Sequence, residues 1–270
     1  MTGFPPVFVI SLSRSVERRA HISRQLSALG VSWEFVDAVD GLELAAEELD
    51  RVVGASNLEV LPGVWRRLTR GEIGCALSHQ RCYRLILARD LPMAFVFEDD
   101  VDVRSSFVEV ANALARFPVN WELVLFAHHS ARNGPRAGAE TTWYGATVHP
   151  EHRVRRVVEF AMGAMAYLVS RAGARKLLTY GTPVRMPADW VTGYAPSAGV
   201  RLHAVTPPVV TPSTALSHGT TLPDREASWE AGPDVRRQPP IAAGLRSWGG
   251  TGLLWLRKAG VWPSAYSRRY

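Results

Sequence analysis

Four acidic side chains fall within five consecutive positions at the end of an apolar run. Residues 94–97 are apolar and typical of a buried strand, and they are followed directly by Glu98, Asp99, Asp100 and Asp102. Carboxylates this close together repel one another and raise each other's pKa unless a cation neutralises them. Hard oxygen donors suit Mg²⁺ or Mn²⁺, with a diphosphate completing the coordination shell. We predict a metal site at this strand end, where α/β sheets bind ligands; the alternative is a solvated acidic turn after an edge strand.

The expected geometry of this acidic segment follows from side-chain alternation in an extended chain. Glu98, Asp100 and Asp102 then share one side, and Asp99 points to the other. Asp100 therefore belongs to either possible ligand pair, with Glu98 or with Asp102. His218 is a candidate for a third protein ligand, because imidazole binds Mn²⁺; the alternative is a loop histidine without a role.

Small residues open a predicted helix at residues 68–79. Thr69 and Glu72 fit the reciprocal bonds of a capping box, and the apolar pattern continues through residues 85–87. A helix N-terminus with small residues admits close backbone approach and favours anions. The candidate residues here are Gly71, Glu72, Gly74, Ser78 and His79. The alternatives are tight helix packing for the glycines and a hydrogen-bonded structural role for the histidine.

Three arginines follow the first apolar segment of the chain. Arg14, Arg18 and Arg19 lie at the start of a polar stretch in which apolar residues recur at helical spacing. They are either a set of side chains that faces phosphate groups or a solvated helix face, and the sequence alone leaves both interpretations open.

The elements that must position these residues alternate along the chain. Strands are predicted over 7–12, 33–39, 94–97, 122–126 and 164–169, and helices after residue 15, over 69–87 and over 171–178. This alternation predicts an α/β fold with a mostly parallel central sheet and flanking helices. Residues 130–153 are expected to form a long surface excursion. The compact domain is predicted over residues 1–220, followed by a proline- and glycine-rich tail over 221–270.

Composition excludes several classes of protein. The chain has 270 residues, of which 47% are hydrophobic and 21% charged, so intrinsic disorder is excluded. No run reaches the ~18 apolar residues of a membrane span, and the first residues lack the basic start of a secretory signal, so we expect a cytoplasmic protein. Cys75 and Cys82 lie seven residues apart in a predicted helix, about 10 Å apart, which excludes a disulfide scaffold or a zinc finger.

The positive charge of the chain is concentrated in its last part. The net charge is +6, but residues 235–270 contain seven basic and no acidic side chains, which leaves the rest nearly neutral. A uniformly basic nucleic-acid binder is therefore excluded. Residues 241–270 interleave aromatic and basic side chains, which suits the headgroup region of an anionic membrane. The alternative is a tail that folds back over an apolar patch of the domain.

Six segments, in their order and spacing, resemble the motifs of glycosyltransferase family 25. They are Val9–Ser15 with Glu17, Arg18 and Arg19, then Phe35–Gly41, Leu68–His79, Val96–Val101, Gly163–Arg171 and Pro187–Trp190. The family includes bacterial lipooligosaccharide galactosyltransferases and collagen galactosyltransferases. The resemblance covers residues 5–220. The chain departs from the family pattern at Cys82 and Tyr83, where a bulkier pair is expected, and at the additional Asp102.

The resemblance implies a GT-A type fold, inversion to a β-linked product, and a nucleotide-sugar donor, usually UDP-galactose. It implies a divalent metal held by the segment Glu98, Asp99 and Asp100. The acceptor is expected to be a lipopolysaccharide, a lipooligosaccharide or another glycan. A lipid-linked acceptor, together with the basic tail, leads us to expect a peripheral position at the inner face of the membrane. We expect donor-binding residues at Ser11, Leu12, Arg14, Arg18, Ala38, Asp40, Gly41, Gly71, Glu72, Gly74, Ser78, His79, Glu98 and Asp99, and metal ligands from among Glu98, Asp100, Asp102 and His218.

Inversion requires one base on the face of the sugar opposite the diphosphate, within reach of the acceptor hydroxyl. Asp189 is the candidate, since it lies beside Trp190, which can stack on a sugar face. The alternative is an acid that caps a structural turn. Another class of function, a catalytically silent sugar-nucleotide or glycan-binding protein, stays open. Metal-dependent nucleotidyl or phosphoryl transfer lacks support, because no GxxxxGK[ST] pattern occurs.

Overall fold

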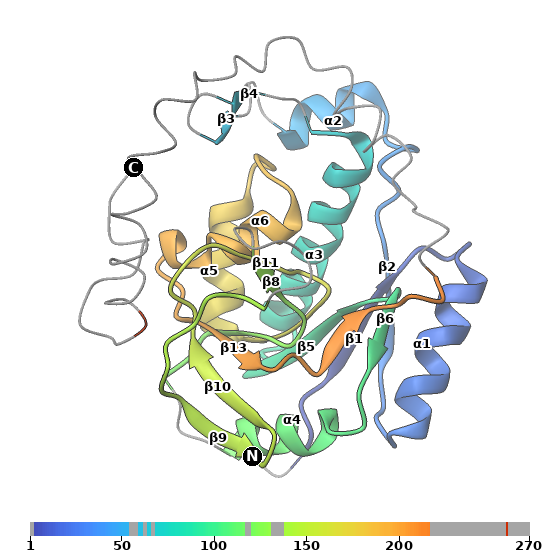
Figure 1. The fold of residues 1–270 in the computed structure, drawn as a ribbon. Helices are drawn as coiled ribbons and strands as arrows, with labels where there is room; N and C mark the ends of the chain where they lie inside the picture. The colour runs from blue at the N-terminus through green and yellow to red at the C-terminus, as the bar shows by residue number, and fades with distance from the viewer. Residues whose placement is uncertain are drawn as a thin grey trace.

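The computed structural model describes residues 3–53, 59–61, 64–65, 68–116, 120–130, 138–216 and 258. Its centre is an eight-stranded sheet (Figure 1). In spatial order the strands are β2 (Glu34–Asp37), β1 (Val7–Ser11), β5 (Met93–Glu98), β12 (Ala166–Ser170), β7 (Leu123–Leu125), β13 (Leu202–Thr206), β10 (His152–Arg156) and β9 (Ala146–His149). Three two-stranded sheets add β14 (Val210–Pro212) with β6 (Val101–Val103), β11 (Ala161–Met162) with β8 (His129–Ser130), and β3 (Glu59–Leu61) with β4 (Val64–Trp65).

Six strands of the central sheet run in one direction, and β12 and β10 run against them. The carboxyl ends of β2, β1, β5, β7 and β13 therefore meet at one edge of the sheet. The segment that leads into β12 begins at the same edge, because Ala166 is paired with Phe97 near the end of β5. Segments far apart in the sequence are thus brought together at this edge.

Helices cover both faces of the sheet (Figure 1). One face carries α1 (Val16–Ala28) and α4 (Phe107–Arg116), and the other carries α3 (Arg70–Ala88), α5 (Arg171–Gly181) and α6 (Ala188–Gly193). The short helix α2 (Ala46–Val53) packs beside the start of α3, and the 3₁₀ turn η1 (Ala195–Ala198) follows α6. This is the α/β architecture, with a mostly parallel sheet and flanking helices, that the sequence predicts. No helix within the described ranges has both the length and the apolarity of a membrane span.

Side-chain alternation along β5 builds the two halves of the core. Phe95 and Phe97 point toward α1 and α4, whereas Ala94 and Val96 point toward α3 and α5. The Phe95 ring meets Phe107 of α4 with ring centroids 5.3 Å apart in an edge-to-face arrangement. Such aromatic contacts contribute about 0.5–1.5 kcal/mol beyond the apolar area that they bury. The central strand is therefore fixed from both faces.

The structure agrees with most predicted elements and corrects one. The predicted capping box at the start of α3 is present, with both reciprocal bonds between Thr69 and Glu72. The surface excursion expected over residues 130–153 is wrong for its second half, where β9 and the start of β10 form an antiparallel hairpin on the edge of the sheet. Their sequence lacks apolar alternation because only Val148, His152 and Val154 are buried there.

The tail and the predicted domain boundary at residue 220 fall largely outside the described residues. Lys258 is the described residue of the tail, and it contacts the loop before β9. Its backbone carbonyl accepts a hydrogen bond from the Trp143 amide at 2.9 Å, and its ammonium group is paired with Glu140. At this position the chain lies against the domain through a backbone hydrogen bond and an ion pair.

Two glycines allow α3 to approach the loop that follows β2. A Cβ atom on Gly41 would lie 1.7 Å from the Arg70 carbonyl oxygen, and one on Gly74 would lie 2.5 Å from the Val39 carbonyl oxygen. Ser78 closes the same contact, because its hydroxyl accepts a hydrogen bond from the Val39 amide at 2.8 Å. The loop of residues 38–41 is thereby held against the helix.

Gly74→Ala is expected to lower the free energy of unfolding by about 1–3 kcal/mol, because the added methyl group overpacks a backbone contact. Gly181→Ala is the matched control. Its Cβ would have contacts of 3.7 Å or more, so alanine's higher helix propensity should leave stability unchanged or raise it by up to ~1 kcal/mol. Urea unfolding followed by circular dichroism measures both. Equal effects of the two changes would contradict the proposed packing constraint.

Candidate active site

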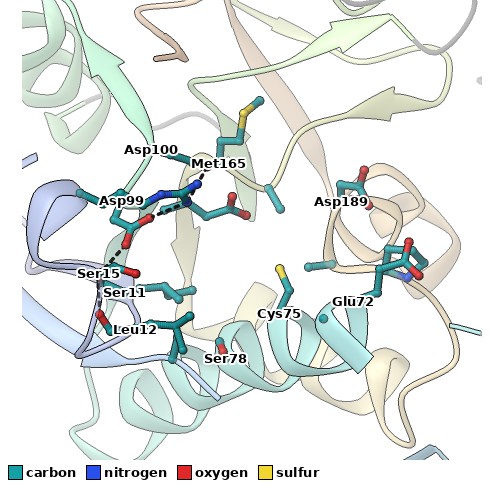
Figure 2. A pocket seen from close by; sticks show the side chains of 18 of the residues that line it. Ser11, Leu12, Ser15, Glu72, Cys75, Ser78, Asp99, Asp100, Met165 and Asp189 are labelled. Carbon is teal, nitrogen blue, oxygen red and sulfur yellow. Dashed lines mark hydrogen bonds and ion pairs between the residues drawn. The ribbon is translucent and has the colours of Figure 1, made fainter. Parts of the chain in front are cut away.

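A cavity of about 520 Å³ lies at the edge of the sheet where the carboxyl ends of β1 and β5 meet. Its walls come from that edge, from the first turns of α3 and from the start of α6 (Figure 2). The site residues predicted from the sequence that line it are Ser11, Leu12, Arg18, Ala38, Asp40, Gly41, Gly71, Glu72, Ser78, Glu98, Asp99, Asp100 and Asp189. Parallel strands explain the convergence, since their carboxyl ends collect at a common edge.

Two adjacent carboxylates at the end of β5 share one arginine. The Arg18 guanidinium lies 3.0 Å from Asp100 Oδ2 and 3.4 Å from Asp99 Oδ1. Asp99 Oδ2 also accepts a hydrogen bond of 2.5 Å from the Ser11 hydroxyl. These contacts come from β1, α1 and the end of β5, and Figure 2 shows them on one wall of the cavity.

Burial makes the charge on these carboxylates unfavourable. The pKa of Asp100 is raised to about 6 by burial and by the nearby charge of Glu98, although Arg18 acts in the opposite direction. Burial likewise raises the pKa of Asp99, against the hydrogen bond from Ser11 and the charge of Arg18. One arginine therefore does not neutralise the three consecutive acids, and the site favours an additional cation.

The alternation expected across residues 98–102 is wrong, because β5 ends at Glu98 and the next two residues form a bend. Asp99 and Asp100 consequently meet the same guanidinium instead of pointing to opposite sides. Asp102 lies on β6, where its carboxylate accepts a hydrogen bond of 2.8 Å from His21, and it is not among the residues that line the cavity. The structure thus does not bring Asp102 to the predicted metal site, and His218 falls outside the described residues.

His79 is buried and does not line the cavity, but it contacts Glu98, which does. Its Nε2 atom lies 3.2 Å from Glu98 Oε1, and its Nδ1 atom lies 2.8 Å from the Tyr167 hydroxyl. The Tyr167 hydroxyl in turn hydrogen-bonds to Tyr83 at 3.1 Å. Burial raises the pKa of both tyrosines, so both hydroxyls keep their protons. This series of contacts links Glu98 to the buried tyrosines behind the cavity wall.

Two other predicted donor-site residues lie just behind the lining. Arg14 is paired with Asp40, which does line the cavity, and more than half of the Arg14 side chain is exposed. Gly74 packs against residues 39–41 and so shapes the cavity from outside. Their direct contact with a donor stays a prediction.

Asp189 lies on the opposite side of the cavity from Asp99 and Asp100 (Figure 2). It occupies the first turn of α6, and Glu72 of α3 lines the same cavity. Its neighbour Trp190 does not line the cavity and instead packs with Phe160 and Tyr194, with ring centroids 5.8 and 6.1 Å away. A carboxylate on each side of an open space permits two different roles in one reaction.

Several lining residues were not singled out from the sequence. They are Ser15, Cys75, the segment Met162–Met165 and residues 212, 213 and 216. His129 also lines the cavity, as its position after the predicted strand 122–126 indicates. Most belong to segments that adjoin β7, β12 and β13, and only the order of strands in the sheet brings them to this edge. Cys75 is different, because it lies one helical turn before His79 in a segment that the sequence does highlight.

The donor set fits the divalent metal that the resemblance implies. Glu98, Asp99 and Asp100 offer hard oxygen atoms beside a cavity. Three carboxylates can carry more negative charge than the single positive charge of Arg18 balances. Mg²⁺ and Mn²⁺ prefer this chemistry, with one or two protein carboxylates and the phosphates of a substrate.

In this cavity, carboxylates lie at the carboxyl edge of a mostly parallel sheet, and a further carboxylate lies across from them. A GT-A type glycosyltransferase is expected to have this arrangement. The profile of "Glycosyltransferase family 25 (LPS biosynthesis protein)" matches residues 4–192. The chain therefore belongs to glycosyltransferase family 25, which confirms the resemblance seen in the sequence.

Two groups of relatives share this domain. The chain is 33% identical over 198 residues to "Probable inactive glycosyltransferase 25 family member 3" of Bos taurus, which covers 69% of this chain and 31% of the relative. It is 30% identical over 190 residues to "Procollagen galactosyltransferase 2" of Homo sapiens, which covers 65% of this chain and 28% of the relative. The chain thus spans about three tenths of the length of these relatives.

Among solved structures, the inositol-1-phosphate CTP transferase from T. maritima is similar with a TM-score of 0.43 and 13% identity. The superposition covers 80% of this chain and 92% of that chain.

Tyr167→Phe is expected to lower the free energy of unfolding by about 1–3 kcal/mol, because it leaves buried polar groups of both His79 and Tyr83 without a partner. Tyr83→Phe should cost less, since the Tyr167 hydroxyl keeps its contact with His79. Chemical unfolding of the two variants tests this order. A larger loss for Tyr83→Phe would show that the chain of hydrogen bonds is anchored elsewhere.

Proposed function

We propose that this protein is an inverting, metal-dependent glycosyltransferase that moves galactose from UDP-galactose onto a hydroxyl group of a glycan. The observation that carries this proposal is the placement of Asp99 and Asp100 on one side of the cavity and of Asp189 on the other. Membership of glycosyltransferase family 25 supports sugar transfer, and the relatives named galactosyltransferases support galactose. The family's description as an LPS biosynthesis protein supports a lipopolysaccharide or lipooligosaccharide acceptor.

The donor is proposed to bind with its diphosphate beside the end of β5. Glu98, Asp99 and Asp100 would hold Mn²⁺ or Mg²⁺, which supplies positive charge for the leaving diphosphate. Arg18 keeps the two aspartates together before the donor arrives, since it contacts both of them. The loop of residues 38–41 and the start of α3 form the adjoining wall, where Gly41 and Gly71 allow close approach of the donor to the backbone.

Asp189 is proposed to act as the general base. Transfer with inversion needs a carboxylate that accepts the proton of the acceptor hydroxyl while the bond between the sugar and the diphosphate breaks on the opposite face. The position of Asp189 across the cavity from the acidic wall supports this role. Glu72, which also lines the cavity, is held by its capping bonds to Thr69.

A peripheral position at the inner face of the membrane is part of this proposal. The basic and aromatic composition of residues 241–270 and a lipid-linked acceptor both support it. Lys258 is paired with Glu140, so any membrane contact would come from other parts of the tail.

A second candidate function is a catalytically silent protein that binds a sugar nucleotide or a glycan. The names of the inactive relatives favour it. Release of UDP from a panel of UDP-sugars, with and without Mn²⁺, separates the two. Metal-dependent release from one donor supports the enzyme, and tight UDP binding without any release supports the silent protein.

Asp100→Ala is expected to reduce transfer at least ~10²-fold, because it removes a carboxylate that faces the leaving diphosphate. Asp102→Ala should have a smaller effect, since Asp102 contacts His21 outside the cavity. Glu109→Ala, an exposed change on α4, controls for general effects of removing an acid. UDP release from UDP-galactose with Mn²⁺ is measured for all three. Near-normal turnover of a folded Asp100→Ala protein would contradict the assignment of Asp100 as a metal ligand.

Asp189→Asn is expected to lower the turnover number by about 10²–10⁴-fold, the usual contribution of a general base, while the dissociation constant for UDP changes little. Turnover with acceptor and calorimetry with UDP are the two measurements. If donor affinity collapsed together with activity, Asp189 would belong to the donor site. If the variant unfolded, the carboxylate would be a structural cap of α6.

A further inference from the structure

A second, chemically different group of potential ligands lies in the wall of the same cavity. Cys75 and His79 stand four residues apart on α3, so they project from the same face of the helix. Glu98 at the end of β5 completes the group. The thiol sulfur, an imidazole nitrogen and a carboxylate oxygen all lie within 4.8 Å of one another.

The donor types of this group differ from those of the acidic wall. Asp99 and Asp100 direct oxygen atoms to Arg18, whereas the Oε1 atom of Glu98 is turned to His79. A thiolate and an imidazole are ligands that zinc prefers over magnesium. A thiolate and a carboxylate together also balance the charge of Zn²⁺, which matters in a wall where burial already disfavours excess charge.

The His79 ring is fixed in the orientation that a ligand needs. The ring is buried and stacks on Tyr167, with centroids 5.7 Å apart, while Nδ1 contacts the Tyr167 hydroxyl. If Nδ1 donates its proton there, the Nε2 lone pair points toward Glu98. Histidines that bind metals usually have such a partner on the second nitrogen, because it fixes both tautomer and ring.

The group is open on the cavity side. Cys75 and Glu98 both line the cavity, and Figure 2 shows the Cys75 sulfur pointing from α3 into it, between the acidic wall and Asp189. Three protein ligands and an open fourth position are the arrangement of accessible zinc sites, in contrast to the four protein ligands of closed structural sites.

We propose that Cys75, His79 and Glu98 form a zinc site whose fourth coordination position faces the cavity. The two cysteines of the chain exclude a zinc finger, but this site needs only one thiolate. Zinc would take the place of the contact between His79 and Glu98, at about 2.0 Å from nitrogen and oxygen and about 2.3 Å from sulfur. This site shares Glu98 with the Mn²⁺ or Mg²⁺ site of the proposed function, but its test reads metal binding through the thiolate and does not depend on sugar transfer.

Cobalt is the probe, because four-coordinate Co²⁺ reports its ligands by absorption. The full chain, reduced and freed of metal, is titrated with Co²⁺. We expect one thiolate-bound cobalt per chain, with a thiolate-to-cobalt charge-transfer band and d–d bands of four-coordinate geometry. Zn²⁺ should abolish these bands at one equivalent. Absence of a charge-transfer band, or its persistence after one equivalent of Zn²⁺, would overturn the proposal.

Cysteine variants identify the thiolate. Cys75→Ser should remove the charge-transfer band, and Cys82→Ala is the matched control on the same helix. Cys82 is fully buried, and burial raises the pKa of its thiol, so it should contribute nothing to the band. A band that survives Cys75→Ser, or one that disappears in a folded Cys82→Ala protein, would contradict the assignment.

Glu98→Gln tests the carboxylate without removing its volume. We expect at least a tenfold weaker binding of Co²⁺, measured by competition with a chromophoric chelator, while the thiolate band stays present at saturation. His79→Gln should lower the affinity by at least as much. Circular dichroism confirms that each variant is folded. Unchanged affinity in either folded variant would remove that residue from the site and with it the three-ligand proposal.

Discussion

The carboxylates at the end of β5 occupy a place where burial opposes their charge, and the arrangement around them compensates for that cost. β5 is a buried strand in the middle of the sheet, so its last residues emerge between neighbouring elements and not at an open surface. Arg18 supplies a positive charge, Ser11 donates a hydrogen bond, and His79 contacts the third carboxylate. Each partner comes from a different element, so the position of β1, α1 and α3 relative to β5 decides whether the acids are stabilised.

The packing of α3 is the second condition for this compensation. His79 contacts Glu98 because α3 packs close to the sheet. The same helix packs against residues 38–41. Gly41 and Gly74 make that approach possible, since any side chain at either position would collide with backbone. The same contact closes the cavity on the side of the proposed donor. Backbone packing and electrostatics at the site are thus coupled through one helix.

Local patterns in the sequence predict the elements well, because they reflect interactions within a few residues. The capping box at Thr69 and the apolar run that becomes β5 are of this kind. Alternation does not predict the bend after Glu98, because it assumes that the strand continues. The bend changes which acids share a cation. Nor does local sequence show that β12 pairs antiparallel with β5, which places Met162–Met165 in the cavity wall. That pairing depends on strands seventy residues apart.

The candidate site residues also divide into those that local sequence predicts and those whose position depends on the order of strands. The acids, the start of α3 and Arg18 lie within or beside predicted motifs, and the parallel order of β2, β1 and β5 brings them together. Asp102 continues the acidic run, but the turn into β6 carries it to His21. The spacing of Cys75 from Cys82 excludes a disulfide, whereas its spacing from His79 places both residues on one face of α3. Spacing on a helix predicts neighbours reliably, whereas spacing across a strand end does not.

Family membership alone does not decide whether the domain catalyses transfer. Relatives named inactive and relatives named galactosyltransferases are similar to this chain at 33% and 30% identity, so the shared fold is common to both groups. A fold positions side chains, and chemistry depends on which side chains it positions. In this chain the acidic wall, its arginine partner and the carboxylate across the cavity are all present in one open space. Glu98 stands between the oxygen donors and the Cys75–His79 pair, so its single carboxylate links the two kinds of metal chemistry that the cavity wall offers.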